Sequence, residues 1–268
     1  MLWQRIVTAL LLAAALAVVL LVLPPNLALA ALGLLVLAGA WEWAAFAGLK
    51  TAAARLVYVA LVGAAAAGLW ILGSGGVQAL TSILGLVLAW WMVAFLWLVF
   101  APARGHPLLA GLAGVFALAP LWLGLARLYV SGDRGYELVI FVLMLAAAAD
   151  VGAYFAGRRF GRRKLAPRVS PNKTWEGFLG GLVAAGAVAV AGDAWFGLPP
   201  AAFLPLCVAT VLASVVGDLT ESLFKRQAGL KDSGSLLPGH GGVLDRIDSL
   251  SAAVPVFTLG MAWLGVVT

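Results

Sequence analysis

Two aspartates near the C-terminal end of the sequence have the type and spacing of metal ligands. Asp245 and Asp248 are three residues apart, so they lie on one face if a helix begins there. Carboxylate oxygens of this kind suit Mg²⁺. Asp218 lies upstream, directly after the apolar run 211–217, where an unpaired charge costs about 2.5–3.5 kcal/mol in lipid. A functional role for Asp218 is therefore the first interpretation.

Basic residues and glycines surround these acids. Gly239, Gly241 and Gly242 let the backbone approach a ligand closely and turn N–H groups toward an anion. His240 lies among them, and a structural role in the loop is the simpler interpretation of a single histidine. Four basic side chains can neutralise phosphate charge: Lys225, Arg226, Lys231 and Arg246. Together with the acids, these residue types indicate a metal-bound polyphosphate.

The polar residues just before this segment share a helical face. Asp218, Glu221, Ser222 and Lys225 follow one another at spacings of three, one and three. Glu221 and Lys225, four residues apart, fit an ordinary surface pair. Asp218 has no such simple explanation.

A second polar segment precedes another apolar run. Asn172 or Thr174 can cap the helix that follows, and Lys173 would reinforce the anion site that a helix N-terminus offers. Asp150 lies deeper in an apolar stretch near a basic segment, and it either supports the site or pairs with an arginine. Glu42, between two tryptophans, fits a membrane interface.

The elements that position these groups follow from composition. The chain has 268 residues, of which 64% are hydrophobic and 10% charged, against about 25% charged in soluble domains. A spanning helix needs about 20 mainly apolar residues. The sequence predicts an all-α integral membrane protein with about nine transmembrane helices, at 6–23, 27–47, 56–73, 78–100, 107–129, 136–156, 175–195, 201–223 and 249–267.

The basic residues set the orientation of these helices. With the N-terminus in the cytoplasm, the inside segments hold all of the 17 basic residues except Arg127 and Arg134. This asymmetry places the C-terminus outside and predicts a multi-pass protein of the cell inner (cytoplasmic) membrane. Because the basic residues follow topology, they argue against nucleic-acid binding.

The same pattern divides the chain. Residues 1–145 carry few charges and are expected to be mainly scaffold helices. Residues 146–268 form the expected catalytic region, with cytoplasmic polar loops at 157–174 and 224–248.

The polar segments resemble a known family. Residues 222–248 follow the signature of the phosphatidate cytidylyltransferases (CDP-diacylglycerol synthases) at every position, through Ser222, Lys225-Arg226, Lys231-Asp232, Pro238-Gly-His-Gly-Gly242 and Asp245-Arg-Ile-Asp248. Residues 170–177 and 150–161 are similar to two further segments of that family. The motifs cover residues 150–249, and the remainder of the chain matches by hydropathy only.

The resemblance implies an enzyme that transfers the cytidylyl group of CTP to phosphatidic acid, giving CDP-diacylglycerol and pyrophosphate. It also implies nine helices in the lipid bilayer, a homodimer, Mg²⁺ and a monovalent cation such as K⁺. By position, Asp218, Asp245 and Asp248 would be metal ligands. The resemblance assigns phosphate contacts to Lys173, Ser222, Lys225 and Arg226. The expected catalytic residues are Asp218, Asp245, Asp248, Lys225 and Arg226. The expected substrate-binding residues are Lys173, Asn172, Ser222, Lys231, Asp232, His240, Gly241, Gly242, Arg246 and Asp150.

The expected mechanism is direct attack of the lipid phosphate on the α-phosphorus of CTP, without a covalent enzyme intermediate. Two alternatives remain open at the level of sequence. A membrane kinase that uses CTP would share the basic loops and acidic ligands. An ion-coupled transporter would use Asp150 and Asp218 as ion sites.

Overall fold

The computed structural model describes residues 2–102, 105–234, 236 and 241–268, and most of them are helical. The long helices are α1 (Leu2–Leu21), α2 (Pro25–Trp43), α3 (Ala52–Gly73), α4 (Val77–Phe100), α5 (Pro107–Tyr129), α6 (Gly135–Phe160), α7 (Trp175–Phe196), α8 (Pro200–Gln227) and α10 (Leu250–Trp263). The remaining elements are the strands β1 (Lys164–Ala166) and β2 (Ser170–Thr174) and the one-turn helix α9 (Leu244–Ile247).

Each predicted apolar segment falls on one of these long helices, which confirms the helical fold class. Seven of the described helices, α2 to α8, are long and apolar enough to cross a membrane. The apolar part of α1 is the shorter stretch Leu10–Leu21, and α10 has 14 residues. The count of nine spans therefore stays a prediction.

Helix ends coincide with residues of restricted or unusual backbone geometry. Pro25 is the first residue of α2, where its fixed φ favours a helix start and its missing N–H costs nothing. Gly197 ends α7 in the left-handed conformation at φ 62°. Thr174 caps the start of α7, because its side chain accepts a hydrogen bond from the Gly177 N–H at 3.1 Å. Of the two candidate caps, Thr174 is the one used.

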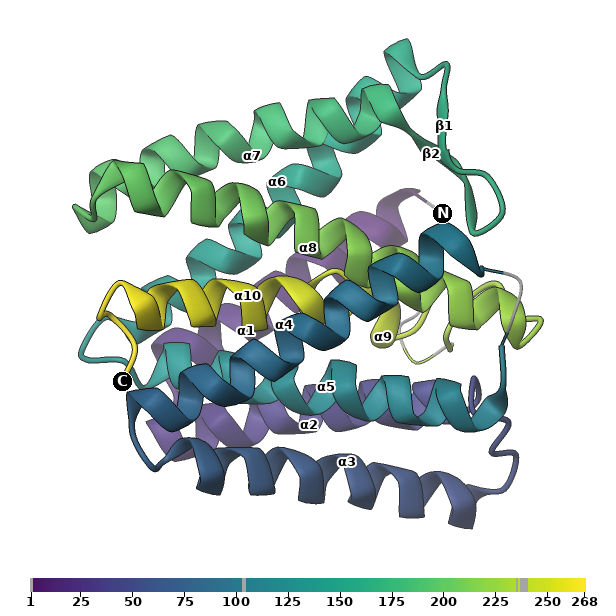
Figure 1. Ribbon diagram of the computed structural model, residues 1–268, viewed down its shortest axis with the longest axis horizontal. Coiled ribbons are helices and arrows are strands. Elements are labelled where there is room, and N and C mark those ends of the chain that lie inside the picture. Colours follow the sequence, from purple (N-terminus) through teal and green to yellow (C-terminus); the bar gives the residue numbers. More distant parts are fainter. Residues whose placement is uncertain (1, 103–104, 235, 237–240) are drawn as a thin grey trace.

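The long helices lie side by side, with the two chain termini at opposite ends of the bundle (Figure 1). The β-hairpin, α9 and the turn between α2 and α3 gather at the end where the N-terminus lies, as predicted for segments on one face of a membrane. The C-terminus and the α7–α8 turn lie at the other end. The structure thus reproduces the predicted alternation, while the assignment of one end to the cytoplasm stays a prediction.

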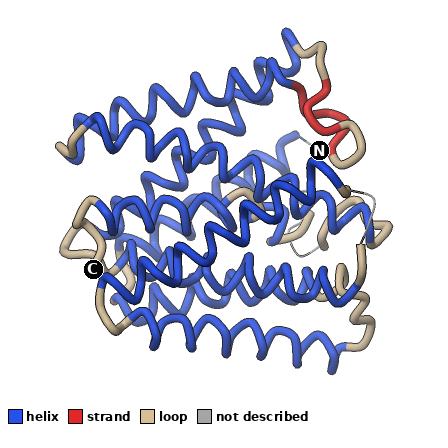
Figure 2. Tube along the Cα trace, viewed as in Figure 1, coloured by secondary structure: helices blue, strands red, loops and turns tan. Residues whose placement is uncertain are grey.

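The polar segment 157–174 differs from the predicted loop. Helix α6 continues to Phe160, and β1 pairs antiparallel with β2, with Lys164 opposite Thr174. Figure 2 shows these strands as the only ones among the described residues. Pairing satisfies backbone N–H and C=O groups that a loop would leave open. The described part of the fold is all-helical apart from this one short hairpin, which the sequence did not predict.

Helices α5 and α10 lie at the centre of the bundle. Every residue of α10 from Ser251 to Ala262 is buried, and α5 packs against α2, α3, α6 and α10. Helices α6 and α7 lie at one edge of the bundle and approach each other through small residues (Figure 1). A Cβ added at Gly152 of α6 would lie 2.6 Å from the carbonyl oxygen of Gly180, so a glycine is needed for this close packing.

Candidate active site

The polar face of α8 begins the site. The Ser222 hydroxyl donates a hydrogen bond to Asp218 Oδ1 at 3.4 Å, one turn away. Lys225 Nζ lies 3.1 Å from Glu221 Oε1, also one turn away. All four side chains therefore share one face, as their spacing predicts.

The pair of Glu221 and Lys225 is buried, so its interpretation as a surface pair is wrong. Glu221 is 1% exposed and Lys225 is 8% exposed. The reason is tertiary: the segment after α8 folds back and brings Asp245 Oδ1 to 2.6 Å from Lys225 Nζ. The ammonium group thus lies between two carboxylates, one from its own helix and one from α9. Burial of this charge is stabilised by both partners.

Asp245 is the acceptor around which this segment folds. Its Oδ2 accepts hydrogen bonds from the N–H groups of Gly242 at 2.9 Å and Ser233 at 3.1 Å. Burial alone would raise the pKa of Asp245, but hydrogen bonds from Lys225 and these amides hold that pKa below its usual value. Gly241 has φ +82°, and a Cβ there would lie 2.9 Å from Asp245 Oδ2. A glycine is therefore required beside this carboxylate.

The hairpin contributes the second half of the site. Lys173 of β2 places Nζ 2.5 Å from Asp218 Oδ2. Beneath this ion pair, Val169 of the hairpin packs against Leu219 and Leu223 of α8. The apolar contact positions the hairpin, and the ion pair joins the two polar segments that the sequence places on one membrane face.

A third set of charges lies next to this ion pair. Asp150 of α6 interacts electrostatically with Asp218, Lys173 and Arg246. Burial, together with the nearby carboxylates of Asp218 and Glu221, raises the pKa of Asp248 well above its usual value. Helix α6, the hairpin, α8 and the segment around α9 therefore bring their acids and bases to one place.

Other predicted residues lie outside this cluster. The Arg226 guanidinium is exposed and donates a hydrogen bond to the Leu230 carbonyl oxygen at 3.3 Å. Asn172, Lys231 and Asp232 have exposed side chains. His240 lies outside the described residues. Gly242 is packed internally: a Cβ there would collide with Ser233 Oγ and Glu42 Oε2.

Glu42 is the residue that sequence analysis underestimated. It is 3% exposed rather than at an interface, and its Oε2 accepts hydrogen bonds from the Leu244 N–H at 2.8 Å and the Ser233 hydroxyl at 3.1 Å. It reaches the site from α2, in the part of the chain predicted to be mainly scaffold. The sequence feature that indicated a role for Glu42 was the presence of an acidic residue inside an apolar helix.

The acidic residues suit a hard cation by chemistry. The carboxylates of Asp218 and Glu221 are close enough to Asp248 to oppose its ionisation, and a divalent cation would relieve that repulsion. Within the described ranges, no three His, Cys, Asp or Glu side chains converge on one metal-sized position. Asp245 already accepts from three internal donors. Its assignment as a ligand stays a prediction, as do those of Asp218 and Asp248.

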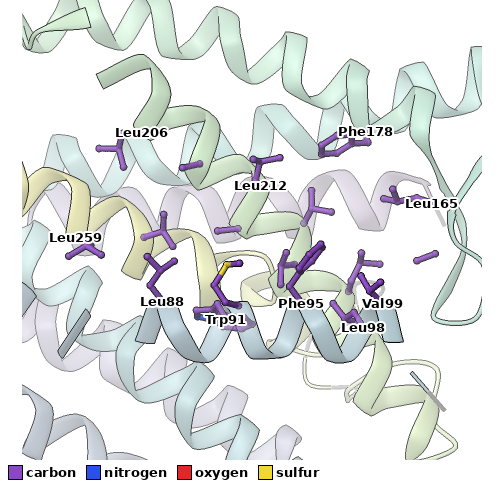
Figure 3. Close-up of a pocket in the computed structure, with 18 of the residues that line it drawn as sticks. Leu88, Trp91, Phe95, Leu98, Val99, Leu165, Phe178, Leu206, Leu212 and Leu259 are labelled. Atoms are coloured by element: carbon purple, nitrogen blue, oxygen red, sulfur yellow. The ribbon is translucent and has the colours of Figure 1, made fainter. Parts of the chain in front are cut away.

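An apolar groove of about 1120 Å³ runs beside the charged cluster. Side chains of α4, α8 and α10 line it, including Trp91, Phe95, Leu212 and Leu259 (Figure 3). Leu219, the neighbour of Asp218 in the chain, also lines the groove, and so do hairpin residues 165–169. Arg168 is the one charged residue among the described lining residues. The groove is thus continuous with the elements that carry the charges.

Comparison with known proteins assigns a family to this arrangement. Residues 3–264 match the sequence profile of the Cytidylyltransferase family. The chain is 41% identical to the phosphatidate cytidylyltransferase of Haemophilus influenzae, over 96% of this chain and 98% of that protein. It is 45% identical to the phosphatidate cytidylyltransferase of Pseudomonas aeruginosa, over 84% of each chain.

Proposed function

This chain belongs to the cytidylyltransferase family and is a nucleotidyltransferase, and from that premise we propose that it transfers the cytidylyl group of CTP to phosphatidic acid in a membrane. The products would be CDP-diacylglycerol and pyrophosphate. The observation that carries the proposal is the position of the charged cluster beside the apolar groove, joined through Asp218 and Leu219 of α8.

The groove gives the lipid substrate a place. Its walls offer apolar contacts to acyl chains along α4, α8 and α10, and Arg168, the one charged residue in the part of the lining that the structure describes, lies in the hairpin. A phosphate attached to chains in this groove would lie beside Lys173 and Asp218. This complementarity favours a substrate with an anionic head and apolar tails over a water-soluble one.

The charged cluster gives the nucleotide a place. Phosphoryl transfer of this type depends on positioning and charge stabilisation rather than on a protein nucleophile. Lys173 would hold the lipid phosphate, Ser222 would donate to a phosphate oxygen, and Arg246 and Arg226 would offset the charge of the leaving pyrophosphate. Lys225, buried between two carboxylates, would act by holding Asp245 and thus the segment that carries Arg246.

Asp218 and Asp248 are the residues that would hold Mg²⁺, with Asp245 in support. Bound Mg²⁺ would supply neutralisation of the opposing phosphate charges. Chelation should abolish the transfer without unfolding the protein, and added Mg²⁺ should restore it. Asp218→Asn and Asp248→Asn should raise the Mg²⁺ concentration needed for the half-maximal rate.

The placement of the protein follows from the same account. The end of the bundle that carries the hairpin and α9 would face the cytoplasm, where CTP is available, with the C-terminus on the outer side of the inner membrane. All nine long helices would span, and two chains would form the homodimer that the family resemblance implies.

The decisive experiment follows isotope from CTP into lipid. Purified protein in detergent receives phosphatidic acid, Mg²⁺ and either α-³²P-CTP or γ-³²P-CTP. Cytidylyl transfer carries only the α label into the organic phase, whereas a lipid kinase carries only the γ label. Failure of both labels to enter lipid, with the protein folded, would contradict the proposed reaction.

A further inference from the structure

We infer that Glu42 is a positioning residue for the nucleotidyl transfer, acting from α2 on the segment that carries Asp245 and Arg246. Glu42 lies outside the family motifs described above, more than 100 positions before the first of them. The inference rests on the proposed function only in using its assay.

The contacts of Glu42 join two separate parts of the catalytic segment. One carboxylate oxygen, Oε2, accepts from the hydroxyl of Ser233 and from the backbone N–H of Leu244. Ser233 in turn donates its own backbone N–H to Asp245 Oδ2 at 3.1 Å. A chain of hydrogen bonds therefore runs from Glu42 through Ser233 to Asp245, and from Asp245 to Lys225 of α8.

The packing around Glu42 is specific to this arrangement. A Cβ added at Gly234 or at Gly242 would collide with the Glu42 carboxylate. Both sides of the segment thus approach the carboxylate at backbone distance, which only glycine permits. Gly234 and Gly242 are therefore both in direct contact with the Glu42 carboxylate.

Helix α2 is fixed against the catalytic region along one face. At Gly39, one turn before Glu42, a Cβ would lie 3.0 Å from Ile247 Cδ1 and 3.6 Å from Leu244 Cδ1. At Trp43, the ring lies 5.8 Å from that of Phe224 of α8, centroid to centroid. The carboxylate is therefore held on a rigid element, which is what accurate positioning of a catalytic group requires.

The environment of the second carboxylate oxygen, Oε1, allows an experiment to distinguish a positioning role of Glu42 from a role that needs its negative charge. Within the part of the chain that the structure describes, Oε1 is buried and accepts no hydrogen bond. An amide at this position could keep the accepting oxygen toward Ser233 and Leu244 and turn its NH₂ toward the place of Oε1. Glu42→Gln therefore preserves the contacts, while Glu42→Ala removes them.

The test compares these two variants with the wild type in the α-³²P-CTP assay. A displacement of about 1 Å at a reacting group can cost about 100-fold in rate, so we expect Glu42→Ala to lower kcat at saturating CTP by at least about tenfold. Glu42→Gln should stay within about threefold of wild type. Hydrogen–deuterium exchange over residues 242–247 should be faster in Glu42→Ala and unchanged in Glu42→Gln.

Glu137→Ala is the matched control. Glu137 also joins two elements, accepting from the indole N–H of Trp195 at 2.8 Å and pairing with Arg134, but it lies in the first turn of α6, far from Asp150. A general loss of helix packing would lower thermal stability in Glu137→Ala and Glu42→Ala alike, whereas only the latter should lower kcat.

Three outcomes would overturn the inference. Glu42→Ala could retain kcat within twofold of wild type, Glu42→Gln could lose as much activity as Glu42→Ala, or Glu137→Ala could lower kcat equally. A wild-type protein that transfers no label would instead contradict the proposed function, and the exchange measurement would still report on the segment. The two failures are therefore distinguishable.

Discussion

Lys225 of α8 and Asp245 of α9 are joined by a 2.6 Å ion pair that closes the catalytic segment back onto the helix from which it departs. The two residues are 20 positions apart in the sequence. Lys225 has a second acidic partner, because its Nζ also lies 3.1 Å from Glu221 Oε1. This relationship makes the geometry of the site depend on a buried cation with two acidic partners, and it gives the substitutions below different expected results.

Asp245→Asn should abolish turnover while the protein still inserts into the membrane. The asparagine would retain one accepting oxygen. Its NH₂ group would face either Lys225 or the amides of Ser233 and Gly242, all of which are donors. Loss of one preorganised hydrogen-bonding group at a reaction centre typically lowers kcat by about 10²–10³, and we expect a loss at least that large here. The measurement is label transfer in detergent, with thermal unfolding in parallel. Asp133→Asn, at an exposed turn far from the site, is the control, and wild-type activity in Asp245→Asn would refute its role.

Lys225→Ala and Arg226→Ala should differ strongly although the residues are neighbours. Removing Lys225 leaves Glu221 and Asp245 buried without their cation, which costs about 3–5 kcal/mol for a buried pair. Arg226 is exposed and contacts a carbonyl oxygen, so its loss should lower kcat/KM for CTP by no more than about fivefold. Thermal unfolding and steady-state kinetics separate the two effects. Equal stability of both variants would contradict the buried pairing.

Lys173 and Asp218 should behave as a unit in a double-mutant cycle. Lys173→Met and Asp218→Asn should each lower kcat/KM by at least about tenfold, because each breaks the ion pair that joins the hairpin to α8. The kcat/KM of the double variant should be no lower than that of the less active single variant. Effects that multiply would show that the two groups act independently.

Filling the apolar groove should raise the KM for phosphatidic acid without changing the KM for CTP. Ala209 lines the groove on α8, and a tryptophan there would occupy space proposed for an acyl chain. Loss of contact with two methylene groups, at about 0.8 kcal/mol each, corresponds to roughly a tenfold higher KM for phosphatidic acid. Ala64→Trp, at an exposed position of α3, is the control. An unchanged KM in Ala209→Trp would place the acyl chains elsewhere.

Hydropathy and charge predicted the helices because a membrane imposes the same requirement on every span. The predicted segment 136–156 lies within α6, and 56–73 lies within α3, which begins at Ala52 after the Thr51 cap. Boundaries differ because polar helix ends extend into the interface, where composition no longer distinguishes helix from loop. The hairpin escaped prediction for a related reason: β1 has three residues and no alternating pattern.

The site was predictable where spacing along one helix decides it. The shared face of Asp218, Ser222 and Lys225 follows from helical periodicity alone. The burial of Lys225 and the role of Glu42 could not follow in that way. Glu42 contacts Ser233 and Leu244 across 191 and 202 positions, and one sequence carries no periodicity over such distances. Only the presence of an acid in an apolar helix indicated that a partner exists.

The length of the last helix, α10, bears on how far below the membrane surface the acidic residues of the site would lie. Helix α10 has 14 residues and so rises about 21 Å, while a bilayer's hydrocarbon core is about 30 Å thick. Its end lies on the side of the bundle with the C-terminus (Figure 1), so a span that reaches the outer surface would begin below the inner surface, beside Asp248. The acids would then occupy a recess below the membrane surface, next to the start of α10, which packs against α4, α5 and α8. A lipid phosphate would reach this recess by moving sideways within its own leaflet, and the nucleotide would be the substrate that descends to meet it.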